Sequence, residues 1–176
     1  MYKMQVWSII EYQNPGLMLV CPSQLKRLDR IQRWFLHELG LTDTEAFLQH
    51  NVAPPSLRRT MGVLGFLHKA QLGLAHPGVR AFFELEDPAR PRFPQLHNKM
   101  LKDKGQNKPT QWPLFRRSVL EHISIYNRLP QAFADAASIS GLQTLLTREA
   151  KRRAEAALDN WRESFISCGD VLAIAR

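Results

Sequence analysis

The apolar positions of the chain recur every three or four residues over long stretches, which is typical of α-helices that bury one face. The clearest run extends from Ser23 to Leu39 and closes at Gly40, and a second extends from Ser56 to Leu72. Two more helices are expected, near Leu114 to Tyr126 and near Ser138 to Phe165. No stretch of useful length alternates with period two. The pattern therefore predicts an all-α fold, an irregular helical bundle with a long C-terminal helix.

Polar residues at the helix boundaries predict where helices begin. Ser23 and Ser138 stand where an N-cap is expected, and Thr42 with Glu45 has the spacing of a capping box. The helix that starts at Thr42 should end before Pro54, because the residue before a proline avoids the helical conformation.

The helical pattern dissolves between Glu84 and Trp112, where prolines alternate with lysines. We expect this segment to be the least ordered part of the chain. The prediction is a helical domain over residues 1–83, a flexible basic linker over 84–112 and a C-terminal helical segment over 113–176. Short helices are also expected from Met1 to Tyr12 and after Pro130.

The charge of the chain is strongly positive: 24 Lys and Arg stand against 16 Asp and Glu, which gives a net charge of +8. Such a surplus favours a polyanionic partner, either nucleic acid or an anionic membrane surface. Only Cys21 and Cys168 are present, and no apolar run approaches the roughly 20 residues of a membrane-spanning helix. We therefore expect an intracellular protein, nuclear or cytoplasmic, that does not enter a membrane.

The sequence carries no recognisable catalytic pattern. Adjacent aspartates, as found in two-metal polymerase sites, do not occur, and neither does a glycine-rich phosphate loop or a Gly-x-Ser-x-Gly elbow. His37-Glu38 begins like a zinc-protease helix, but Leu41 replaces the second ligand. We expect no metal, no cofactor and no enzymatic activity from the chain alone.

Basic residues form a stripe on the first long helix, because helical geometry places Lys26, Arg30, Arg33 and His37 on one side of it. A cationic stripe on a rigid helix can follow a phosphate backbone. The alternative is an ordinary solvated face, which Asp29 and Glu38 partly flank. Trp34 and Trp112 are expected in a core or a lid, and no stacking role is assigned to them.

The second long helix carries a strip of Arg58, Gly62, Gly65, Lys69 and Gly73, which suggests close approach of another helix or of a nucleic-acid backbone. With two further basic clusters, the full set of predicted nucleic-acid-binding residues is Lys26, Arg30, Arg33, Arg58, Arg59, Lys69, Arg116, Arg117, Arg148, Lys151 and Arg152.

Several segments, taken in order, resemble the region after the catalytic palm in reverse transcriptases of non-LTR (LINE-like) retrotransposons, most closely those of dinoflagellate-type protists. The segments are Gln5-Val6-Trp7-Ser8, Ile10-Glu11-Tyr12, Leu28-Asp29-Arg30-Ile31-Gln32, Phe35-Leu36-His37-Glu38-Leu39-Gly40, His50-Asn51-Val52-Ala53-Pro54, Leu57-Arg58-Arg59, Leu64-Gly65-Phe66-Leu67-His68-Lys69 and Tyr126-Asn127-Arg128-Leu129-Pro130.

The resemblance implies a thumb-like domain over residues 1–83, and hence a grip on the template-primer duplex through phosphates rather than bases. The family's palm with its paired aspartates is missing, so polymerase activity does not carry over, and the chain resembles the tail of a larger or decayed element. The expected partners are an RNA or DNA duplex, bound without sequence specificity, and a reverse transcriptase palm. The alternatives are a helical protein-interaction module that docks a palm or another polypeptide, and an enzyme whose site only the fold would assemble.

Overall fold

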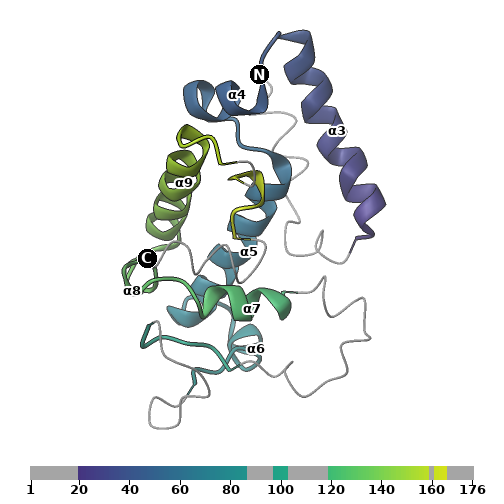
Figure 1. Cartoon of the computed structure of the whole chain (residues 1–176). Helices are drawn as coiled ribbons and strands as arrows, with labels where there is room; N and C mark the ends of the chain where they lie inside the picture. The colour runs from purple at the N-terminus through teal and green to yellow at the C-terminus, as the bar shows by residue number, and fades with distance from the viewer. Residues whose placement is uncertain (1–19, 87–96, 103–118, 159–160, 166–176) are drawn as a thin grey trace.

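The computed structural model describes residues 20–86, 97–102, 119–158 and 161–165, and it is helical (Figure 1). Within these residues no strand forms, and a single antiparallel bridge joins Leu85 to Leu101. The predicted all-α fold is confirmed. The expected helix from Met1 to Tyr12 and residues 114–118 lie outside the described part of the chain. The elements in chain order are α3 (Pro22–Glu38), α4 (Asp43–His50), α5 (Pro55–Gln71), α6 (Pro77–Arg80), α7 (Glu121–Tyr126), α8 (Gln131–Ala134), α9 (Ile139–Glu155) and the 3-10 turn η3 (Trp161–Glu163).

Helix α5 lies at the centre and packs along α9 (Figure 1). The two helices approach closely at Gly65, where a β-carbon would lie 3.2 Å from both Ile139 and Gln143 of α9. The neighbour of the glycine strip at this point is therefore another helix. The same packing places Leu142 and Leu146 of α9 in the core, fully buried.

The predicted helix starts are mostly correct. Thr42 and Glu45 form a capping box, and Ser138 accepts a hydrogen bond from the backbone N–H of Gly141 at 3.0 Å. The prediction of Ser23 as an N-cap is wrong, because α3 already begins at Pro22, with Cys21 before it. Proline suits the first helical position, where its fixed φ is favourable and its missing N–H is not needed.

The C-terminal helix is shorter than predicted. It ends at Glu155 instead of reaching Phe165, and Ala157 adopts a left-handed φ of 51° that reverses the chain. Trp161 is nevertheless buried, as its spacing predicts, because its ring stacks on Phe47 of α4 with 5.4 Å between centroids. The helical periodicity correctly predicted that Trp161 is buried, but it wrongly predicted that the backbone there is helical. A turn can place the same side chain in the core.

Part of the predicted linker belongs to the core. Leu101 is fully buried, and its backbone makes two hydrogen bonds with the side chain of Asn127, N–H to Oδ1 at 2.8 Å and Nδ2 to C=O at 2.7 Å. His97 is also buried, with Nε2 3.1 Å from the carbonyl oxygen of Tyr126. For residues 97–102 the expectation of a flexible linker is wrong, because His97, Met100 and Leu101 are buried and the polar groups of His97 and Leu101 are hydrogen-bonded inside the fold.

A buried hydrogen-bond chain joins α5 to α7. His68 is fully buried, with Nε2 2.9 Å from the carbonyl oxygen of Ala136 and Nδ1 2.9 Å from the hydroxyl of Tyr126. Since a carbonyl only accepts, Nε2 carries the proton, and the Tyr126 hydroxyl donates to Nδ1. Tyr126 and Asn127 are both buried, and their side chains join α7 to α5 and to Leu101.

Candidate nucleic-acid interface

Helix α3 is held against the rest of the protein along one side. Leu36 is buried in a small cluster with Ala46 and Val52. Gln32 is also buried, and its side-chain amide donates to the carbonyl oxygen of Ala53 at 3.0 Å. These contacts fix which side of α3 faces inward, and so fix which side faces solvent.

Asp29 and Arg59 form a two-point ion pair between α3 and α5. Arg59 donates from Nη1 to Oδ1 at 2.8 Å and from Nη2 to Oδ2 at 3.1 Å. The Arg59 side chain is 6% exposed and that of Asp29 is 24% exposed. The assignment of Arg59 to the phosphate-binding residues is therefore wrong, because its guanidinium is buried and holds a carboxylate.

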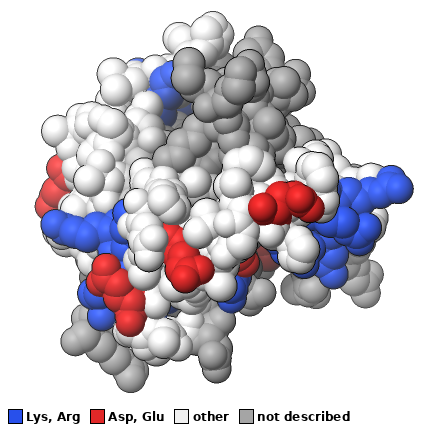
Figure 2. Space-filling model, turned by 90° about the horizontal axis from the view of Figure 1, so that it is seen from above, with Lys and Arg blue, Asp and Glu red and all other residues white. Residues whose placement is uncertain are grey.

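The same ion pair changes the electrostatics of the cationic stripe. In the sequence Asp29 and Glu38 flank the stripe. In the fold the carboxylate of Asp29 is held by Arg59, whereas Glu38 is 59% exposed and lies 4.0 Å from Nδ1 of His37. Lys26, Arg30 and Arg33 are exposed, and no carboxylate within the described residues pairs with any of them. Figure 2 shows Lys and Arg side chains gathered at the right edge of the molecule, over α3. The structure thus brings three of the predicted residues together on one exposed face, with the carboxylate of Glu38 at the C-terminal end of the same helix.

Two residues of this face were not assigned by the sequence analysis. Arg27 is exposed, and its guanidinium contacts the side-chain oxygen of Gln24 at 3.4 Å. Trp34 is 66% exposed, although it was expected in a core or lid. Helical geometry places Trp34 about 40° from Arg30 and about 20° from Arg27 around the α3 axis. The available signal was that Trp34, unlike Phe35, lies off the apolar side of the predicted helix. We define the α3 face as Lys26, Arg27, Arg30, Arg33 and Trp34.

The predicted residues of α5 do not join the α3 face as a group. Arg58 is partly buried, and Lys69 is exposed in the last turn of α5. Ten residues of helix separate Lys69 from Arg59, which is about 15 Å along the axis. Arg116 and Arg117 lie outside the described residues.

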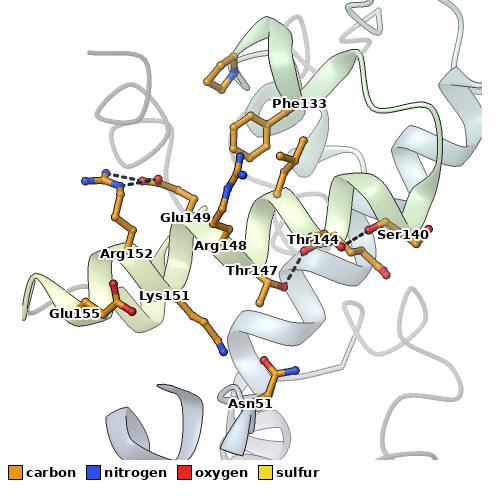
Figure 3. A pocket seen from close by; sticks show the side chains of 13 residues that line it. Asn51, Phe133, Ser140, Thr144, Thr147, Arg148, Glu149, Lys151, Arg152 and Glu155 are labelled. Carbon is orange, nitrogen blue, oxygen red and sulfur yellow. Dashed lines mark hydrogen bonds and ion pairs between the residues drawn. The ribbon is translucent and has the colours of Figure 1, made fainter. Parts of the chain in front are cut away.

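The basic residues of α9 line a hollow of 1020 Å³ but do not converge on one point (Figure 3). Arg152 is held by Glu149 through two hydrogen bonds of 2.8 and 2.7 Å, which lower the pKa of that carboxyl. Lys151 extends toward Asn51 and lies 5.6 Å from the ring centroid of Phe47, whereas Arg148 points to the opposite side. This surface is a mixed one, in which Glu149 neutralises part of the positive charge.

No described helix is long and apolar enough to cross a membrane. Within residues 20–86, 97–102, 119–158 and 161–165, no three His, Cys, Asp or Glu side chains gather as metal ligands would.

Comparison of the chain with protein-family models, with curated proteins and with solved structures gave no match. The geometry of the α3 face is therefore the basis for the functional argument that follows.

Proposed function

We propose that the protein binds the phosphate backbone of nucleic acid through the α3 face, without sequence specificity and without a catalytic step of its own. In the setting that the sequence resemblance implies, the chain is a thumb and post-thumb fragment of a retroelement reverse transcriptase, and its ligand is a template-primer duplex.

The observation that carries this proposal is the ion pair between Asp29 and Arg59. It engages the carboxylate of Asp29, one of the two acidic residues that flank the stripe, while leaving Lys26, Arg30 and Arg33 in solvent on a rigid helix. Cations fixed on one face bind a polyanion by releasing its counterions, and the gain grows with each phosphate neutralised. Contacts of this kind position a protein on a nucleic acid without reading bases.

The test is the salt dependence of binding to a fluorescent duplex. About four cations of the α3 face should give a slope of log affinity against log salt of about −3 to −4. Changing Arg30 and Arg33 together to Gln should weaken binding to every duplex alike and flatten the slope by up to about two units. Gln is a good helix former, so the variant should keep its circular dichroism spectrum.

A matched control lies on α9. Changing Arg148 and Arg152 to Gln removes the same net charge from the surface where Glu149 already holds Arg152. We expect a slope change of less than about one unit. Equal changes of the salt slope in the two double variants would mean that the net charge of the protein attracts the duplex. The α3 face would then not be the binding surface.

One observation favours the second candidate, a module that docks another polypeptide such as a polymerase palm. Leu74, Phe82 and Leu85 are 61%, 68% and 52% exposed, and all three lie in or near the α6 segment. Exposed apolar side chains close together in a chain are typical of a protein-docking surface. Binding to a palm that is insensitive to salt and lost in Phe82→Ser, with no binding to any duplex, would favour this candidate.

A further inference from the structure

We infer that Trp34 is a base-stacking residue and that the α3 face takes nucleic acid with unpaired nucleotides, such as a single strand or the overhang beside a duplex. The inference rests on the proposed function, since it requires the cations of the same face to hold the phosphates. It adds the class of ligand and names the residue that selects it.

Trp34 is exposed on a helix whose apolar side is already occupied. The inward side of α3 is buried through Leu36, which is 2% exposed and packs against Ala46 and Val52. Trp34 instead keeps 66% of its surface in solvent. A large apolar ring in water is unfavourable by roughly 25 cal/mol for each Å² left uncovered, so a partner that covers it gains that free energy.

The neighbours of Trp34 indicate what that partner is. Around the α3 axis, Arg30 lies one turn before Trp34 at about 40°, and Arg27 lies two turns before it, about 10 Å along the axis. Glu38, 59% exposed, follows one turn later, so the cations lie on one side of the ring along the helix. An aromatic ring at the end of a row of cations fits a strand whose phosphates bind the cations while one base stacks on the ring. A base inside a duplex has both faces covered by its neighbours, so stacking on Trp34 requires an unpaired base.

A lipid surface fits this face less well. Membrane-surface helices bury a broad apolar face, but the apolar side of α3 packs against the protein through Leu36 and its cluster. Beside Trp34, α3 and its C-cap expose Ile31 at 45% and Leu39 at 55%. At 100° per residue Trp34 and Leu39 lie about 140° apart around the helix axis, so these side chains do not form one compact apolar face for insertion, whereas one ring suffices for one base.

The test compares three fluorescent ligands of equal length: an oligothymidylate of about twelve nucleotides, an abasic strand with the same phosphates, and a blunt duplex. The wild-type protein should bind the oligothymidylate about 5- to 100-fold more tightly than the abasic strand, because the abasic strand keeps the charge and loses the base. Trp34→Leu should reduce that ratio to near one, and Trp34→Phe should keep most of it.

Two controls separate stacking from other effects. Phe82 is equally exposed, at 68%, but lies outside the cationic face, so Phe82→Leu should leave the ratio unchanged. The salt slope for the oligothymidylate should be the same in Trp34→Leu as in the wild type, because the cations remain.

The outcomes distinguish this inference from the proposed function. Unchanged preference for oligothymidylate over the abasic strand in Trp34→Leu overturns the stacking role, while a slope that still depends on Arg30 and Arg33 leaves the proposed function standing. Absence of binding to all three ligands overturns both. Tighter binding to vesicles of anionic phospholipid than to oligothymidylate, lost in Trp34→Leu, overturns the inference in favour of a membrane surface.

Discussion

Arg59 on α5 donates hydrogen bonds to both carboxylate oxygens of Asp29 on α3, at 2.8 and 3.1 Å. This ion pair joins the candidate interface to the core of the protein. A bidentate pair is stronger and more directional than a single hydrogen bond to an ion. It therefore fixes the rotation of α3 as well as the charge on its outer face.

Changing Asp29 to Asn is expected to destabilise the fold by about 2 kcal/mol. The variant leaves the Arg59 guanidinium, whose side chain is 6% exposed, without a carboxylate partner. Urea unfolding followed by circular dichroism would measure the loss. The double variant with Arg59→Met should recover most of it, because an apolar replacement leaves no buried charge. A double variant less stable than Asp29→Asn alone would show that the pair does not act as a unit.

The free energy of unfolding should decrease as the pH is lowered from 7.5 to 5.5. Burial is the main cause that lowers the pKa of both His68 and His97 below their ordinary value. The unfolded chain takes up protons near pH 6.5 while the folded histidines resist them, so the full stability is present above that pH and is lost as pH falls toward the folded-state pKa. Urea midpoints at the two pH values would measure the loss.

Two comparisons identify the histidines as the cause. Glu149, whose pKa is lowered mainly by its hydrogen bond to Arg152, loses its contribution only below about pH 4.5, outside this window. The pKa of His68 is lowered mainly by burial, so His68→Gln should flatten the pH dependence. Equal pH dependence in this variant and the wild type would assign the effect to other groups.

Changing Tyr126 to Phe should cost about 1–2 kcal/mol. The variant keeps the buried ring and removes the hydroxyl that donates to Nδ1 of His68, which leaves a buried acceptor unsatisfied. The His68 ring should also become easier to protonate, because Nδ1 no longer accepts a hydrogen bond. Thermal unfolding measures the cost, and no change in unfolding temperature would contradict the hydrogen bond.

Asn127→Leu should destabilise the fold by more than Tyr126→Phe, by about 2–4 kcal/mol. It removes two hydrogen bonds at once and leaves the backbone N–H and C=O of Leu101 buried without them. Hydrogen exchange at the amide of Leu101 should accelerate in the variant. Slow exchange there, as in the wild type, would mean that residues 97–102 are held by other contacts.

The sequence could predict those parts of the fold that depend on neighbouring residues. The capping box of Thr42 and Glu45 forms because both partners lie within one turn, and Ser138 caps α9 for the same local reason. The end of α9 could not be predicted in this way. The helical spacing continues to Trp161, but the chain turns at Ala157, and the stacking of Trp161 on Phe47 is a contact between distant segments.

For the candidate site, too, the sequence could predict the features that depend on neighbouring residues and could not predict those that depend on distant ones. Helical periodicity places Lys26, Arg30 and Arg33 on one face, and the structure keeps them exposed there. The sequence cannot say which of two adjacent arginines is buried, because that depends on where the carboxylate of Asp29 lies in space. Arg59 meets that carboxylate, and its neighbour Arg58 does not.

Gly65→Ala should change stability by less than about 1 kcal/mol, whereas Gly65→Leu should destabilise by about 1–3 kcal/mol. A methyl group would lie 3.2 Å from Ile139 and from the exposed side chain of Gln143, which can shift, and alanine also favours the helix. Leucine has no room between α5 and α9. Urea unfolding of the two variants tests this, and a neutral Gly65→Leu would show that α9 can move away from α5.

Removing the buried Arg59 is expected to weaken nucleic-acid binding although its guanidinium does not reach solvent. In Arg59→Met the carboxylate of Asp29 loses its partner, and its charge lies next to the cations of the α3 face. One charge at this range contributes about 0.5–1 kcal/mol, so affinity for a duplex at low salt should fall about two- to fivefold. The double variant with Asp29→Asn removes that charge and should restore the affinity. If Arg59→Met remains helical and binds as tightly as the wild type, the Asp29 charge does not act on the face, and the cations there bind phosphate independently of the ion pair.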